Sequence, residues 1–402
     1  MTPKSTETTG SAASAPNLAY IDCLRGYAIF LVMCCHTAYA YPELPYPVHR
    51  TAAFGWHGVQ LFFLASCVTL MMSAQREIEK SNRLDIPNFF IRRFLRIAPM
   101  YYTGALIYWI AWKFPNAPLW NAAASLLFVN SWHPVTMSTV PNGWAAVPGG
   151  WSIGVEFTFY FLFPIFMAWV TSLKRALAGF AGAIIIAVVA NSLLKDPLTS
   201  AYGETAADNF LYFWFFNQAP VFFLGSVVFF LMKKIKEEPT SLLGAAFGRR
   251  SSICAYSALA VLAGLAATTF PFGHHFLAEP AVPKFLLASL AFAAFMLALS
   301  QMKQTVLINP LAASLGKVSF SAYVLHFAVI DLLLHGNARL FHLDATSWSA
   351  IAAFVLGLAA VTVVTFVASS VTYRLIEAPF MAQAKRLTSA RMRVASSVPV
   401  SP

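Results

Sequence analysis

The sequence predicts an all-α, polytopic integral membrane protein with about ten transmembrane helices and both termini in the cytoplasm. Of its 402 residues, 58% are hydrophobic and only 11% are charged. A soluble domain carries roughly 25% charged and about 45–50% apolar residues, so this composition excludes an ordinary soluble enzyme, a disordered chain and a coiled coil. Two further observations support the fold class: the apolar residues are gathered in long segments, and the basic residues lie mostly on one side of them.

Each predicted helix is a largely apolar segment, and about 20 such residues are needed to cross a bilayer. Residues 1–17 are small and polar and predict a disordered tail. Residues 383–402 predict a basic cytoplasmic tail, which leaves residues 18–382 as one transmembrane domain. Residues 119–129 are apolar but too short to cross, so we expect an interfacial or re-entrant segment there. The predicted helices cover residues 20–39, 54–73, 97–112, 151–170, 177–194, 210–232, 253–270, 283–300, 318–335 and 347–373.

The basic residues are divided unevenly between the two sides that these helices define. Of the 27 Lys and Arg residues, 22 fall on the side of the termini and 5 on the other. Cytoplasmic loops carry an excess of Lys and Arg, so the termini are predicted to be cytoplasmic. The net charge of +11 then indicates membrane topology, and no nucleic acid partner is expected. The five on the outer side are Arg50, Lys113, Lys195, Lys284 and Arg339.

The five cysteines lie in or beside apolar segments, with no CxxC pair and no Cys/His spacing typical of metal ligands. Cys34 and Cys35 are adjacent, and neighbours on a helix point about 100° apart. We therefore expect small apolar core residues, without a disulfide or a metal site.

Arg25 and His36 lie in the first predicted helix, where ionisable residues are expensive and indicate function. They are eleven residues apart, which brings both to one helix face, about 16 Å from each other along the axis. Arg25 then lies near the cytoplasmic headgroups and His36 near the middle of the bilayer. Because an unperturbed imidazole titrates at about pH 6.5, His36 is the natural proton acceptor.

Glu156 lies in the fourth predicted helix, about 8 Å below the outer surface and at a depth comparable to that of His36. A lone carboxylate there needs a partner. Glu156 is predicted either to orient and charge-stabilise the imidazole or to be a structural hydrogen-bond anchor. His326, in the ninth predicted helix, is a further intramembrane histidine.

Two clusters near the helix ends each permit a structural and a functional interpretation. Arg92, Arg93 and Arg96 either anchor the chain to anionic lipid or clamp phosphate, with which guanidinium pairs bidentately. Six of the ten tryptophans lie between residues 109 and 151. Tryptophan is common at membrane interfaces, but its flat ring with an N–H donor also suits stacking on a sugar.

Seven segments in order resemble the membrane-bound acyltransferase-3 family, the bacterial O-acetyltransferases of surface polysaccharides and related acceptors. The chain departs from many relatives at Gln60, where they have Asp, and at Ser66-Cys67, where they have Ser-Gly. We expect the stand-alone form, without the hydrolase-like domain that some relatives carry. The matching segments are IDCLRGYAIFLVMCCH (21–36), GWHGVQLFFLASC (55–67), FFIRRFLRIAPMYY (89–102), GGWSIGVEFTFYFLFP (149–164), FFLGSVVFF (222–230), LGKVSFSAYVLH (315–326) and YRLIEAPF (373–380).

The resemblance implies a bacterial inner-membrane enzyme that uses acyl-CoA, usually acetyl-CoA, as its cytoplasmic co-substrate. It implies an acceptor hydroxyl, on a glycan or glycolipid, that is reached from outside or from within the membrane. It also assigns the catalytic site to Arg25 and His36. His36 is expected to act as general base or to carry the acyl group covalently, and Arg25 to bind donor phosphate or orient the thioester.

The remaining candidates follow from the same division between donor and acceptor. Glu156 is expected to support the imidazole or to shape the acceptor site, and Arg93 and Arg96 to help bind the donor. The substrate-binding candidates are Trp151, Ser152, Tyr160, Gln60 and His326.

Two alternatives stay open at this stage. A transporter could use His36, Glu156 and His326 as a proton relay, although such proteins usually contain two matching half-chains and no clear duplication is visible. Within the enzyme class, the acceptor could be a glycan, a lipid-linked sugar or a small molecule such as a macrolide.

Overall fold

A computed structural model describes residues 19–112, 119–137, 146–269, 272, 275–276, 282–303, 305–335 and 347–397. These residues form helices and turns, with one isolated bridge between Thr305 and Ile308 and no strand among them. The predicted all-α fold class is confirmed. The tail predicted at residues 1–17 and the tryptophan at position 144 lie outside the described residues.

The helices follow the predicted apolar segments, with several longer than expected because polar ends continue the same helical turns. Within the described ranges the α-helices are α1 (Ala19–Ala38), α2 (Tyr46–Ala53), α3 (Gly58–Ser81), α4 (Ile86–Trp112), α5 (Leu119–Leu126), α6 (Trp151–Trp169), α7 (Leu173–Tyr202), α8 (Glu204–Phe213), α9 (Phe215–Glu237), α10 (Ser251–Ala267), α11 (Lys284–Ser300), α12 (Pro310–Lys317), α13 (Ser319–Ile330), α14 (Ser347–Thr372) and α15 (Ala378–Ser397).

The described part of the chain contains six helical runs that are long and apolar enough to cross a membrane, or seven if α12 and α13 form one broken span with its 81° bend. The chain is therefore a multi-pass membrane protein, but the predicted count of about ten is not confirmed. The helices α10 and α11 are apolar and contain 17 residues each, a length of about 26 Å against a hydrocarbon core of about 30 Å.

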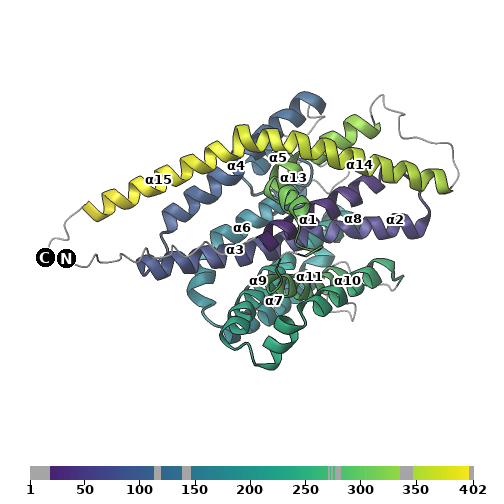
Figure 1. Cartoon of the computed structure of the whole chain (residues 1–402). Helices are drawn as coiled ribbons and strands as arrows, with labels where there is room; N and C mark the ends of the chain where they lie inside the picture. The colour runs from purple at the N-terminus through teal and green to yellow at the C-terminus, as the bar shows by residue number, and fades with distance from the viewer. Residues whose placement is uncertain are drawn as a thin grey trace, which may run out of the picture.

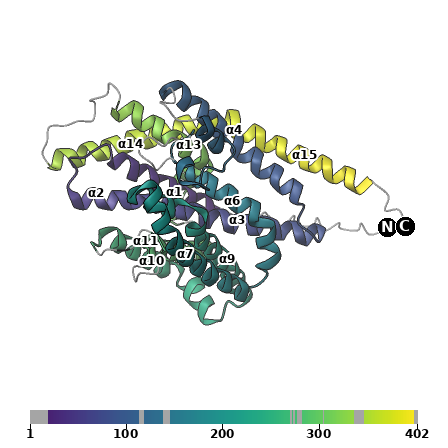
Figure 2. The same ribbon diagram turned by 180° about the vertical axis from the view of Figure 1, so that it is seen from behind.

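The helices form one bundle around α1 and α3, which pack against each other. Figures 1 and 2 show α7, α9, α10 and α11 on one side of this pair and α4, α13, α14 and α15 on the other. On the first side α9 packs against α3 and α7. On the second side α13 and α14 pack against α1. The helix that carries Arg25 and His36 thus packs against other helices on several sides.

Glycines allow two segments to approach the backbone of α1 closely. A Cβ atom at Gly316 of α12 would lie 1.7 Å from the carbonyl oxygen of Asp22, and one at Gly26 would lie 2.1 Å from that of Ala312. On another face, Gly55 and Gly58 meet α1 in the same way, with carbonyl oxygens 2.0 and 2.4 Å from the corresponding Cβ positions. Small residues permit such contacts between membrane helices, so α1 is held on two sides.

The segment from 383 onward, predicted as a basic tail, is helical as far as Ser397 in α15. Figure 1 shows α15 running beside α4, and these two helices pack together. Asn88, near the start of α4, donates a side-chain hydrogen bond of 3.5 Å to the carbonyl oxygen of Thr388.

Candidate active site

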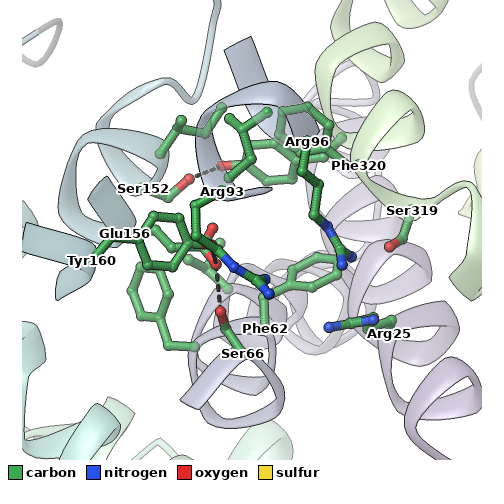
Figure 3. A pocket seen from close by; sticks show the side chains of 15 residues that line it. Arg25, Phe62, Ser66, Arg93, Arg96, Ser152, Glu156, Tyr160, Ser319 and Phe320 are labelled. Carbon is green, nitrogen blue, oxygen red and sulfur yellow. Dashed lines mark hydrogen bonds between the residues drawn. The ribbon is translucent and has the colours of Figure 1, made fainter. Parts of the chain in front are cut away.

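A cavity bounded by α1, α3, α4, α6 and α13 contains many of the predicted site residues. Its volume is about 80 Å³, enough for several water molecules or a small acyl group, since one water needs roughly 10–15 Å³. Figure 3 shows Arg25, Arg93 and Arg96 directing their guanidinium groups into this space. The polar side chains of the lining are Arg25, Ser66, Arg93, Arg96, Ser152, Glu156, Tyr160, Ser319 and Tyr323.

Positive charge exceeds negative charge in this cavity, because three guanidinium groups face one carboxylate, that of Glu156. None of the three arginines forms an ion pair with another described residue. Arg25 Nη2 donates a hydrogen bond of 3.3 Å to Thr69 Oγ1, and Arg93 Nε is buried with no partner in the described structure. The one carboxylate leaves an excess of positive charge among these half-buried side chains, so the cavity is suited to an anionic ligand.

The arginine cluster of α4 is divided between two faces of the helix. Arg93 and Arg96 line the cavity, whereas Arg92 forms an ion pair of 2.5 Å with Glu77 of α3. Successive residues of a helix point about 100° apart, which separates Arg92 from Arg93. The phosphate-clamp interpretation of this cluster therefore fits two of its three arginines.

Two hydroxyl groups and two arginines surround the carboxylate of Glu156. The hydroxyl groups of Ser66 and Tyr160 each donate a hydrogen bond of 2.5 Å to Glu156 Oε1, and the carboxylate interacts electrostatically with Arg25 and Arg93. Within the described structure no contact joins Glu156 to His36. The described neighbours of the Glu156 carboxylate are therefore two hydroxyl groups and two arginines.

One face of α13 connects this cavity to the histidines. Ser319, Tyr323 and His326 are separated by four and three residues, the spacing of one helix face. Ser319 and Tyr323 line the cavity, and the ring centroid of Tyr323 lies 5.6 Å from that of His326. The Tyr323 hydroxyl is 2.8 Å from Ser152 Oγ and donates to the carbonyl oxygen of Gly149 at 3.0 Å.

His36 and His326 lie together beyond Tyr323. Their ring centroids are 5.3 Å apart, and both rings contact Phe327, at 4.4 and 4.2 Å. The side chain of His326 is fully buried. The structure thus brings the predicted base next to the second intramembrane histidine, in a part of the site separate from the arginine cavity.

The predicted acceptor-binding residues are distributed over several contacts. Ser152 and Tyr160 line the arginine cavity. Trp151 is half-buried and packs on Phe213, with ring centroids 4.4 Å apart. Gln60 is buried, and its Nε2 donates to Gln218 Oε1 at 3.0 Å, which makes it part of a polar contact between α3 and α9.

Ser66, which lines the cavity, and Glu377, which contacts α13, had no role assigned from the sequence. Ser66 was noted only as the residue before Cys67, where the chain departs from related sequences, yet it donates a hydrogen bond to Glu156. Glu377 accepts hydrogen bonds from the backbone N–H of Ser321, at 3.1 Å, and from its hydroxyl, and so caps the N-terminal turn of α13. The signal for Glu377 was present, because it is an acidic residue in a largely apolar segment.

Comparison with known proteins identifies the family to which the chain belongs. A family model described as an acyltransferase domain matches residues 18–370, which is most of the chain. The chain belongs to the acyltransferase-3 family. The resemblance predicted from the seven segments is confirmed, and the protein is an acyltransferase of this family embedded in a membrane.

Two curated relatives of this acyltransferase-3 chain bear names that describe their activity. "Acyltransferase MdmB" of Streptomyces mycarofaciens is 27% identical over 393 residues, covering 93% of both chains. "Peptidoglycan O-acetyltransferase OatA" of Listeria monocytogenes is 26% identical over 222 residues, covering 49% of this chain and 34% of that protein. No solved structure matches the chain significantly.

Proposed function

We propose that the protein is a bacterial inner-membrane O-acetyltransferase that moves an acetyl group from cytoplasmic acetyl-CoA to a hydroxyl group of an envelope or extracellular glycan. The observation that carries this proposal is the arginine cavity, where Arg25, Arg93 and Arg96 face a single carboxylate without forming an ion pair within the described structure. Such a cavity favours a polyanionic ligand, and CoA carries phosphate groups that guanidinium binds bidentately.

The distance between the arginines and His36 fits the shape of CoA. His36 follows Arg25 by eleven positions in α1, a distance of about 16 Å along the helix axis. A donor held by its phosphates at the arginines needs a long, thin arm to bring its acyl group to the imidazole. The pantetheine arm of CoA, which ends in the thioester, has this form. Tyr323 lies along the route, because it lines the cavity and contacts His326.

In the proposed reaction, the unprotonated ring nitrogen of His36 removes the proton from the acceptor hydroxyl. The acceptor oxygen attacks the thioester carbonyl and forms the ester bond, and the carbon–sulfur bond breaks. The CoA thiolate leaves and receives the proton from His36. In a variant of this sequence the imidazole nitrogen itself first takes the acetyl group and then passes it to the acceptor.

A glycan acceptor is supported by one of the curated relatives and by the outer aromatic residues. The name of the Listeria relative gives peptidoglycan as its acceptor. On this chain Trp109, Trp120 and Trp132 are exposed, and such rings suit contact with a sugar. Trp132 also donates a hydrogen bond of 2.9 Å to Thr158 of α6, two residues from Glu156.

The function is tested by mass spectrometry of envelope glycans from cells with and without the protein, together with release of free CoA by purified protein in liposomes. We expect an acetyl-sized mass gain on a glycan that depends on the protein, and CoA release that depends on added glycan. Proton-coupled uptake of a solute without any consumption of acetyl-CoA would instead support a transporter.

Arg93→Ala is expected to raise the KM for acetyl-CoA roughly 10- to 100-fold, because hydrogen bonds to charged groups are worth about 1.5–3 kcal/mol. The kcat value should change much less, since Arg93 lies in the cavity and not beside His36. Initial rates at varied acetyl-CoA concentration, measured in proteoliposomes, give both constants.

Arg92→Ala is the matched control, because Arg92 is the adjacent residue and pairs with Glu77 outside the cavity. A partly exposed pair of this kind contributes about 0–1 kcal/mol, so its removal should leave the KM within about threefold. Equal effects of the two substitutions would mean that the cluster acts through the membrane surface and not through the donor.

A further inference from the structure

We propose that His326 is a positioning residue for His36, whose ring it orients by accepting a hydrogen bond from one ring nitrogen so that the other is left free to act as the base. This inference rests on the function proposed above and adds a residue to it. It differs from the sequence-based expectation, in which His326 contacts the substrate and Glu156 either supports the imidazole or shapes the acceptor site.

The hydrogen bond made by His326 determines which of its nitrogens carries the proton. His326 Nδ1 is 2.7 Å from the carbonyl oxygen of Tyr323, in the same helix. A carbonyl oxygen only accepts hydrogen bonds, so Nδ1 must donate and must carry the proton of the neutral ring. His326 Nε2 then has a free lone pair and can accept a hydrogen bond.

The acceptor nitrogen of His326 is buried without a partner. The residue has no exposed surface, and Nε2 has no hydrogen-bond partner in the part of the chain that the structure describes. Leaving a buried acceptor unsatisfied is destabilising. A group that supplies an N–H at this point, directly or through one water, removes that penalty.

His36 is the neighbour that can supply this N–H. Its ring centroid lies 5.3 Å from that of His326, a separation that allows facing ring nitrogens to be joined by a hydrogen bond or by one bridging water. Phe327 packs on both rings, at 4.4 and 4.2 Å, and restricts how far either can turn. Tyr39 is a further titratable residue near His36, with its ring centroid 6.4 Å away.

Glu156, the other candidate for orienting His36, has other hydrogen-bond partners. Its Oε1 accepts hydrogen bonds from Ser66 and Tyr160, and its charge is placed beside Arg25 and Arg93. A neutral second histidine is also the less costly partner inside a membrane, because it orients the base without adding a buried charge.

During the reaction, the proton of the acceptor hydroxyl moves to the free nitrogen of His36. The N–H on the opposite side of the ring stays bonded to His326 Nε2 throughout, and this bond strengthens when His36 becomes positively charged. No proton passes to His326, and the CoA thiolate later takes the proton from the same nitrogen that received it.

The activity test compares His326→Phe, which keeps the ring volume but removes the acceptor, with His326→Gln, which retains an acceptor at the distance of Nε2. We expect His326→Phe to lower kcat about 10- to 100-fold, as loss of an orienting partner does at other sites, with the KM for the glycan within about threefold. His326→Gln should recover at least a tenth of the wild-type kcat. His49→Phe, at a histidine that packs on Tyr39, is the matched control and should leave both constants unchanged.

The structural test does not depend on activity. Nitrogen-15 NMR of histidine-labelled protein in liposomes distinguishes the two neutral tautomers, and the His36 signal is assigned by its absence from His36→Gln. We expect one tautomer of His36 in the wild type and a mixture of two in His326→Phe. The inference is overturned if His326→Phe leaves the His36 signal unchanged, or if it raises the glycan KM at constant kcat, which would make His326 a substrate contact. Absence of acetyl transfer by the wild type would contradict the proposed function, while the NMR result would still test the pairing.

Discussion

Replacing His36 with alanine is expected to lower the rate of acetyl transfer roughly 10²- to 10⁴-fold, the contribution of a positioned general base. The affinity for acetyl-CoA should change less than about threefold, because the arginines that we assign to the donor lie in a cavity that His36 does not line. Single-turnover transfer of labelled acetyl groups in proteoliposomes, combined with equilibrium binding of acetyl-CoA, separates the two quantities.

His36→Gln is the companion variant, because it keeps a polar side chain of similar volume against Phe327 but supplies no base. It should be as inactive as His36→Ala while folding normally, as judged by its elution as a single species in detergent. Transfer above one tenth of the wild-type rate in either variant, at equal protein level, would exclude His36 as the base. In that case acyl-enzyme formation on His36 would be excluded as well.

The sequence predicted the fold class, and which ionisable residues line the cavity, better than it predicted the number of membrane-spanning helices. Charged residues inside apolar segments and basic clusters at their ends are local features of a sequence. They led to Arg25, Glu156 and Arg93, which the structure brings into one cavity. Whether a helix crosses the membrane depends also on its length and direction. A hydropathy pattern does not show the 81° bend between α12 and α13.

The partners within the site depend on contacts between segments far apart in the sequence. The sequence predicted a comparable depth in the membrane for Glu156 and His36, but depth along a helix does not give the direction of a side chain around it. In the structure Glu156 binds Ser66, which is 90 residues away, and His36 lies beside His326. The roles of these residues stay predictions, whereas their neighbours are now described.

Gly316→Ala, which places a methyl group on Gly316, is expected to lower the free energy of unfolding by about 1–3 kcal/mol or more, the usual effect of overpacking. The added Cβ would lie 1.7 Å from the carbonyl oxygen of Asp22 in α1. A backbone carbonyl cannot turn away as a flexible side chain can, so α12 and α1 must separate. We expect Gly316→Ala to lower both the amount of folded protein and its melting temperature in detergent.

Gly182→Ala is the control for this substitution, because Gly182 lies inside helix α7 and a Cβ there meets nothing within 4 Å. Alanine should stabilise that helix by about 0.5–1 kcal/mol, so the two variants are expected to shift the melting temperature in opposite directions.

Asp22 and Gly26, the points at which α12 touches α1, lie on either side of Arg25. Any Gly316→Ala protein that folds should therefore bind acetyl-CoA more weakly, since separating α12 from α1 displaces the guanidinium group that faces the donor. If Gly316→Ala melts at the same temperature as Gly182→Ala, α12 does not pack closely on α1. In that case the packing of α12 does not hold Arg25 in position either.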